Sequence, residues 1–307
     1  MAEKMSLKKS LEDLCKATGL HFTLDAEDAE DEELAAEKIA LIADAYREKN
    51  SKTNFIRSLL CGKLDEAETY AMAARFHVPT DESRAIYVIE TQTVNDENSF
   101  NVLKQLFLTK THDFALQMDE KRLALIKSLH EKDTDSEMKA TAHTIVDMLA
   151  AEAMSGVRVG YSREIFGLLK MPQAYREARL SLEVGRIFYT NESVIRYERL
   201  GIGRLVYELP TETCRLFLDE VFGGRMPDSF DEETTTTINT FFDNNLNISE
   251  TARLLYVHRN TLVYRLEKLH QATGLDIRVF DDAMTFKIAS MVAGYLKDKE
   301  EKDNETV

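Results

Sequence analysis

The chain has 307 residues, of which 44% are hydrophobic and 30% are charged, and its formal net charge at pH 7 is −15. This length predicts two or three domains of a soluble protein, and no run of about 18 apolar residues indicates a membrane span. The acidic balance argues against indiscriminate nucleic-acid binding, because phosphates attract local positive charge. The N-terminal residues lack the pattern of a signal peptide. Cys15, Cys61 and Cys214 lie far apart without metal or redox spacing, which predicts free thiols in a reducing cytoplasm.

Residues 1–79 are predicted to be mainly helical. Residues 1–33 contain a short amphipathic helix from Leu7, strand-like residues 21–24 and an acidic linker. Residues 34–79 carry apolar side chains at helical spacing and end at Pro79. This second segment either pairs with its copy in a dimer or packs within its own domain, and the pattern favours neither.

Residues 80–209 alternate between strand and helix patterns. Strands are predicted over 84–91 and 156–161, a hairpin over 113–126 around Asp119-Glu120, helices over 99–108, 135–154 and 172–183, and short strands over 186–189 and 194–197. This order predicts a ferredoxin-like α+β domain, with helices packed on one antiparallel or mixed sheet.

The remaining residues are predicted to be helical. Residues 210–229 read as a linker with a helix over 211–222, and residues 301–307 as a disordered tail. Between them, residues 230–300 predict a support helix, two short helices joined by a turn, and a long apolar helix over 283–296. The fold class is therefore multidomain and mostly α, with a central α+β domain and a C-terminal all-α helix-turn-helix domain.

The two short helices between residues 247 and 269 are the most informative stretch. Asn247 or Ser249 can cap the first helix, and Asn247 with Glu250 has the spacing of a capping box. In the second helix, Leu262, Leu266 and Leu269 share one face, which predicts an inner side. This is the pattern of a helix-turn-helix, whose second helix lies in the DNA major groove.

The polar side chains of this stretch are the candidate DNA contacts. Arg259 is predicted to make a bidentate contact with a guanine edge, Asn260 to contact adenine or phosphate, and Thr261 to anchor a phosphate. His258 is either a turn residue or a phosphate donor, and Arg265 either braces the fold or reaches a phosphate. The full predicted set is Ser249, Thr251, His258, Arg259, Asn260, Thr261, Tyr264, Arg265 and Lys268.

The local charge balance differs from that of the whole chain. Between residues 249 and 270 there are four Arg or Lys residues and two Glu residues, which leaves about +2. An acidic chain with a mildly basic DNA-binding segment would suppress non-specific binding. Specific binding would then need two such segments, which predicts a homodimer.

The residues Val257-His-Arg-Asn-Thr-Leu-Val-Tyr-Arg-Leu266, with Ser249, Thr251-Ala252 and Thr273-Gly-Leu-Asp276, resemble the C-terminal domain of PucR/CdaR-type bacterial transcription regulators. Residues 157–162, 174–185 and 196–205 are similar to the degenerate GGDEF-like domain of the same family. The resemblance implies a bacterial cytoplasmic regulator, often an activator of catabolic or transport genes. The family's purine-related or sugar-acid sensor domains are not evident, so no inducer is named.

An enzymatic role is not expected. Active diguanylate cyclases carry a Gly-Gly-acid-acid signature on the central hairpin, whereas this chain has Gln117-Met-Asp-Glu-Lys121 there. Asp119 and Glu120 are therefore predicted to be turn residues rather than metal ligands, and neither a metal nor a cofactor is predicted. Two other hypotheses remain: a ligand- or partner-sensing module centred on the α+β sheet and, with less support, a nucleotide cyclase.

Overall fold

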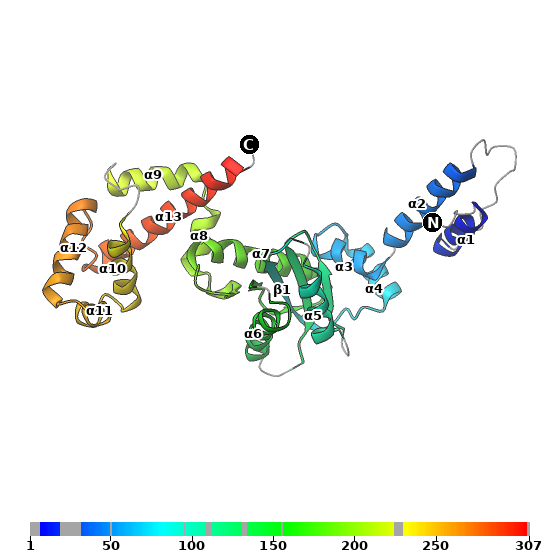
Figure 1. Cartoon of the computed structure of the whole chain (residues 1–307), viewed down its shortest axis with the longest axis horizontal. Helices are drawn as coiled ribbons and strands as arrows, with labels where there is room; N and C mark the ends of the chain where they lie inside the picture. The colour runs from blue at the N-terminus through cyan, green and yellow to red at the C-terminus, as the bar shows by residue number, and fades with distance from the viewer. Residues whose placement is uncertain are drawn as a thin grey trace. The chain divides into compact units, whose positions relative to one another are not determined.

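The computed structural model describes residues 7–18, 32–49, 51–94, 96–108, 112–130, 134–154, 156–223 and 230–305 (Figure 1). The chain divides into two compact units, Met1–Arg179 and Leu180–Val307. None of the described helices is both long enough and apolar enough to span a membrane.

The first unit begins with two helices that contact each other, α1 (Leu7–Thr18) and α2 (Glu32–Lys49). Ala36 and Ala43 of α2 are buried, and their small side chains share one helix face, so α1 can approach closely. The predicted strand-like residues 21–24 and most of the acidic linker lie outside the described residues. Pairing of this segment with a second copy stays a prediction.

Two further helices complete the predicted helical segment, α3 (Lys52–Leu60) and α4 (Glu66–Phe76). The Ser51 hydroxyl accepts a hydrogen bond from the Asn54 N–H at 3.1 Å, which begins α3. Asp65 and Glu68 form a reciprocal capping box at the start of α4. The helical prediction for this part of the chain is confirmed.

A sheet with helices between its strands forms the rest of the first unit. Its elements are β1 (Ser83–Thr91), α5 (Glu97–Phe107), β2 (Phe114–Gln117), β3 (Arg122–Ser128), α6 (Thr134–Glu152) and β4 (Val157–Tyr161). The strands lie in the order β2-β3-β1-β4, and neighbouring strands are antiparallel. A short strand, β5 (Ile165–Phe166), also pairs with the start of β1. This βαββαβ order confirms the predicted α+β domain.

The centre of this sheet is strand β1, whose residues 85–89 are completely buried. The Tyr87 hydroxyl donates a hydrogen bond to the Met138 carbonyl of α6 at 3.2 Å, and its ring stacks on Tyr161 of β4. Helix α6 therefore covers one face of the sheet. The short 3-10 helix η1 (Leu168–Lys170) leads from β5 into the next helix.

Helix α7 (Met171–Phe188) corrects one prediction, because residues 186–188 of the expected strand 186–189 form its last turn. Its Gly185 allows close packing, since a Cβ there would lie 2.7 Å from Ile195 Cγ1. Ile195 belongs to β6 (Val194–Arg196), which was predicted correctly. Tertiary packing thus overrides the local strand preference of this apolar, aromatic stretch.

The second unit is otherwise helical. After η2 (Tyr197–Arg199) its helices are α8 (Gly201–Glu208), α9 (Thr211–Phe222), α10 (Glu232–Asp243), α11 (Ile248–Leu254), α12 (Arg259–Thr273) and α13 (Phe280–Glu305). Phe286 of α13 lies in the core, where its ring contacts the rings of Phe222, Phe230 and Phe242. Helix α13 continues beyond the predicted end at Leu296 and includes much of the expected disordered tail.

Candidate nucleic-acid interface

The predicted helix-turn-helix is formed by α11, a tight turn and α12. The Asn247 side chain accepts hydrogen bonds from the N–H groups of Ser249 and Glu250, at 3.0 and 3.1 Å, so Asn247 rather than Ser249 caps α11. The predicted capping box is not formed. Glu250 instead accepts a hydrogen bond from Arg253 Nε at 3.1 Å, within an ion pair one helical turn along.

The turn closes α11 with two backbone hydrogen bonds, from the Val257 N–H to the Ala252 carbonyl at 3.0 Å and from the Tyr256 N–H to the Arg253 carbonyl at 3.2 Å. His258 then caps α12, because its Nδ1 accepts a hydrogen bond from the Asn260 N–H at 3.2 Å. Of the two roles predicted for His258, the structure thus shows the one within the turn. Since Nδ1 acts as an acceptor, Nε2 is the ring nitrogen that can donate outward.

The inner face of α12 is the predicted one. Leu262, Leu266 and Leu269 are all buried, and they belong to one core with Ala252 of α11 and Phe241 of α10. The small side chain of Ala252 allows α11 and α12 to approach. This packing fixes which side chains of α12 face outward.

Most of the predicted DNA-contacting side chains lie on the exposed surface of this unit. The exposed members are Ser249, His258, Arg259, Asn260, Thr261, Tyr264 and Lys268. All of them except Ser249 lie on α12 or at its cap. Lys268 Nζ lies 5.8 Å from the centre of the Tyr264 ring, so these two outward side chains are neighbours.

Thr251 is a correction to the predicted set. Its side chain is completely buried, and its hydroxyl has no hydrogen-bond partner among the described residues. A nucleic acid cannot reach it without opening the core. The sequence places Thr251 only one residue from the small Ala252, and both face inward.

The charged side chains divide into paired and free groups. Arg253 pairs with Glu250, and Arg265 pairs with Glu233 of α10. Glu267 accepts a hydrogen bond from Arg278 at 2.8 Å. Within the described part of the chain, no acid forms an ion pair with Arg259 or Lys268. The local positive charge inferred from the sequence therefore resides mainly on these two exposed residues.

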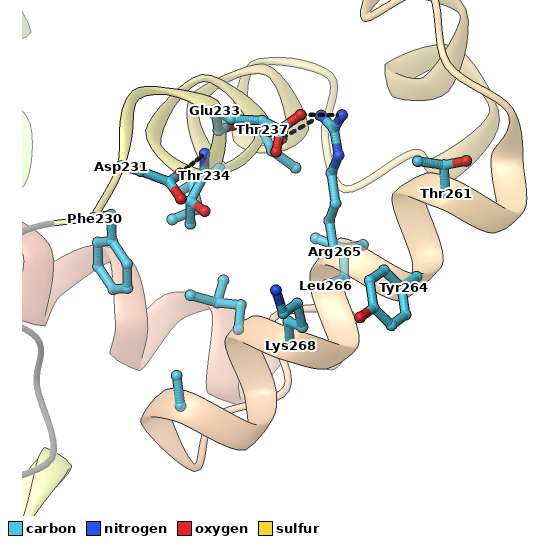
Figure 2. A pocket seen from close by; sticks show the side chains of 13 residues that line it. Phe230, Asp231, Glu233, Thr234, Thr237, Thr261, Tyr264, Arg265, Leu266 and Lys268 are labelled. Carbon is cyan, nitrogen blue, oxygen red and sulfur yellow. Dashed lines mark hydrogen bonds and ion pairs between the residues drawn. The ribbon is translucent and has the colours of Figure 1, made fainter.

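Arg265 braces the fold, which is one of its two predicted roles. It extends from α12 to α10, where its guanidinium contacts the Glu233 carboxylate, and Nη1 donates to the Thr237 hydroxyl at 3.2 Å (Figure 2). Its aliphatic part lies in a groove of about 440 Å³ between α10 and α12. Thr261, Tyr264 and Lys268 line the α12 side of this groove (Figure 2).

The other side of the groove is acidic. Asp231 caps α10, and hydrogen bonds from the side chain and backbone of Thr234 hold the pKa of Asp231 below its ordinary value, with smaller contributions from Lys268 and Arg265. Asp231 is therefore negatively charged near pH 7. The first turn of α12, by contrast, carries Arg259 and no acid.

The hairpin of the α+β domain contains a turn at Asp119. Asp119 Oδ1 accepts a hydrogen bond from the Lys121 N–H at 3.0 Å, and its other oxygen lies 3.8 Å from Arg122 Nη1. This is the predicted turn role of Asp119. Among the described residues, no group of three or more His, Cys, Asp or Glu side chains is arranged to hold a metal ion.

Two family models match the chain. The model described as the PucR C-terminal helix-turn-helix domain matches residues 234–292, which contain α11 and α12. The model described as the GGDEF-like domain matches residues 62–184, which contain strands β1 to β5.

Individual relatives match in part. The purine catabolism regulatory protein of Bacillus subtilis is 26% identical over 162 residues, which is 51% of this chain and 30% of that protein. The carbohydrate diacid regulator of Escherichia coli is 40% identical over 53 residues, or 17% of this chain and 14% of that protein. An uncharacterized Haemophilus influenzae protein is 23% identical over 263 residues, or 85% of this chain and 70% of that protein. The matched segments thus span less than a third of the two named regulators.

Proposed function

The chain has the domain combination of a PucR/CdaR-type regulator, a GGDEF-like domain followed by a PucR-type helix-turn-helix domain, and from this premise we propose that it binds specific duplex DNA sequences and regulates transcription. The binding element is α12 with its cap and the preceding turn. The same comparison supports a regulator rather than an enzyme.

The observation that carries this proposal is the exposed first turn of α12. Arg259, Asn260 and Thr261 are consecutive, exposed and next to the helix cap. A helix of 15 residues is about 22 Å long and can lie in the major groove, with its first turn closest to the base edges. Arg259, which has a bidentate guanidinium and no internal acid partner, is our candidate for reading a guanine.

Phosphate contacts would position this helix. Thr261, with its hydroxyl, and the backbone N–H groups at the start of α12 can donate to phosphate oxygens. Lys268, two turns further along α12, supplies a positive charge whose attraction to phosphate does not depend on the DNA sequence. Arg265 is not available for this purpose while it pairs with Glu233.

Arg259 and Lys268, the exposed cations of α12 without an ion pair among the described residues, provide little electrostatic affinity, because each neutralised phosphate releases only about one counterion. A homodimer would double the phosphate contacts and read two half-sites. We therefore propose that the DNA-binding form is a homodimer with two copies of α12 about one helical turn of DNA apart.

The regulated genes are proposed by analogy. The relatives include proteins named purine catabolism regulatory protein and proline-responsive transcriptional activator, both from Bacillus subtilis. We propose that this chain acts in the bacterial cytoplasm as an activator of a catabolic or transport gene set. The small molecule that would control it is not assigned.

The test is selection of bound fragments from a fragmented bacterial genome by the purified full chain. We expect enrichment of a short sequence, with affinity for that duplex at least about 10³-fold above random duplex. Recovery of fragments in proportion to their abundance would contradict sequence-specific binding. Turnover of nucleoside triphosphates with magnesium by the same preparation would instead support the cyclase alternative.

A further inference from the structure

The turn between α11 and α12 contains a residue that the sequence did not single out. Tyr256 has φ of +55°, in the left-handed region. The two hydrogen bonds around it, from Val257 to Ala252 and from Tyr256 to Arg253, form a Schellman motif, in which the left-handed position is usually glycine. A residue with a Cβ is strained there, because the Cβ approaches the backbone carbonyl.

Left-handed helix ends in this chain carry either a residue with a Cβ, such as His77 at the end of α4, or glycine. Helices α9 and α12 end at Gly223 and Gly274, with φ of +55° and +82°. Apart from adjacent chain atoms, no atom of the described residues lies within 4 Å of the place where either glycine would carry a Cβ. The left-handed ends of α9 and α12 are therefore exposed and carry glycine. The end of α11 is also exposed but carries a tyrosine.

The Tyr256 side chain makes no contact within the described residues that would offset this strain. It is 95% exposed, and within the described part of the chain it makes no hydrogen bond, ion pair or ring contact. Burial of its ring therefore contributes almost no free energy to the isolated chain. Strained backbone positions cluster at functional sites, so a contact outside the chain would account for Tyr256.

We propose that Tyr256 is a DNA-contacting residue, whose hydroxyl donates a hydrogen bond to a phosphate at the edge of the groove that α12 enters. This assignment rests on the proposed function. Tyr256 lies two residues before the His258 cap and three before Arg259, so it stands beside the end of α12 that approaches DNA. A tyrosine hydroxyl is a common donor to phosphate. It also extends further from the backbone than the side chains of Val257 and His258 in the same turn.

The experiment uses three variants of the full chain. Tyr256→Gly removes both the strain and the side chain, and Tyr256→Phe removes only the hydroxyl. His77→Gly is the matched control, because His77 is exposed, has φ of +51° and ends α4 with the same two hydrogen bonds. For each variant we would measure the Tm and the Kd for the selected duplex at several salt concentrations.

Relief of strain should raise the Tm of Tyr256→Gly by about 2–4 °C. Loss of the phosphate contact should weaken its DNA binding by about 5- to 10-fold without changing the salt dependence, because the hydroxyl is neutral. Tyr256→Phe should keep the wild-type Tm and lose about 5-fold in affinity. His77→Gly should gain in Tm and bind DNA like the wild type.

The proposal is overturned if Tyr256→Gly is more stable yet binds the selected duplex as tightly as the wild type, since the ring would then contact some other partner or none. A Tm that does not rise would show that the turn carries no strain to explain. Failure of the proposed function looks different, because the wild-type chain itself would then fail to prefer the selected duplex.

Discussion

Two arginines, Arg84 in the GGDEF-like domain and Arg259 in the helix-turn-helix, show opposite uses of the same charge. The Arg84 side chain is completely buried, and Nη2 donates to the Pro79 carbonyl at 2.7 Å and to Glu82 at 2.9 Å. Arg259 is exposed and has no acid partner among the described residues. Burial lowers the pKa of Arg84, although Glu82 and Asp113 oppose this effect.

The neighbouring charges follow the same division. In the GGDEF-like domain, Lys127 Nζ lies 3.3 Å from the buried Asp113, whose other oxygen accepts from the Ser128 N–H at 2.8 Å. These charges hold the ends of strands together. In the helix-turn-helix, neither Arg259 nor Lys268 forms an ion pair with any of the described residues. Cations that the fold does not use are the ones available to an external polyanion.

The largest effect is expected for Leu266→Ala, which removes core packing from the helix-turn-helix without changing any charge. Leu266 is 1% exposed, so truncation leaves a cavity and should cost about 2–5 kcal/mol of unfolding free energy. DNA binding should be lost with the fold of this unit, as denaturant unfolding monitored by circular dichroism would show. Full stability with normal binding would mean that the inner face of α12 is assigned wrongly.

Arg84→Ala should destabilise the GGDEF-like domain by about 3 kcal/mol, because Glu82 loses a buried partner. At a temperature where the variant is still folded, its Kd for DNA should equal that of the wild type. Thermal unfolding and DNA titration would be compared on one preparation. A specific loss of DNA affinity would show that Arg84 is not simply a structural charge.

Arg259→Ala should give the reverse result. It should cost about 1–3 kcal/mol of binding free energy on the selected duplex and relax preference at one base pair. Its Tm should not change, because Arg259 makes no internal ion pair. Competition between selected and random duplexes measures the preference directly. Equal losses on both duplexes would exclude base readout by Arg259.

A smaller and different effect is expected for Lys268→Ala. Binding should weaken by about the same factor on every duplex, and the slope of log K against log salt should fall by about one per copy. Affinities measured between 50 and 200 mM salt, the range over which phosphate contacts show their effect, would supply the slope. An unchanged slope would show that Lys268 does not meet a phosphate.

The smallest effect concerns the loop after α12 and depends on pH. Hydrogen bonding to Arg278 lowers the pKa of Asp276. A lowered pKa in the folded state gives stability that is present above the unfolded value of about 3.9 and is lost as the pH falls through the folded value. Asp276→Asn should therefore lower stability at pH 7 by at most about 1 kcal/mol, because the pair is partly exposed.

This difference between wild type and Asp276→Asn should shrink below about pH 4 and vanish once Asp276 is protonated. Thermal scans from pH 7 to pH 3 would follow it. A difference that stays constant over this range would assign the loss to packing or geometry rather than to the carboxylate charge.

Much of the fold was predictable because local patterns and tertiary packing agree. The leucines of α12 have helical spacing and an apolar environment, so both point to the same inner face. The local pattern and the tertiary packing disagree at residues 186–188. This run resembles a strand in sequence, but it completes α7, which packs against Ile195.

The position of the candidate site was predictable from the sequence, but the ion pairs of its charged side chains were not. Which charged side chain remains without an ion pair depends on partners elsewhere in the sequence. Arg265 pairs with Glu233, and Glu267 pairs with Arg278. Thr251 was misassigned because a threonine fits either face of a short helix, and only the packing shows that it lies inward beside Ala252. The left-handed backbone of Tyr256 gave no signal, since glycine is the usual sign of such a turn.

The most direct test of the central claim is acetylation of lysines in the full chain, with and without the selected duplex. Lys268, on the exposed face of α12, should react in the free protein and be protected by DNA. Lys139, exposed on α6 of the GGDEF-like domain, should react equally in both states. If Lys268 reacts at the same rate when the duplex is bound, the exposed face of α12 is not the DNA-binding surface.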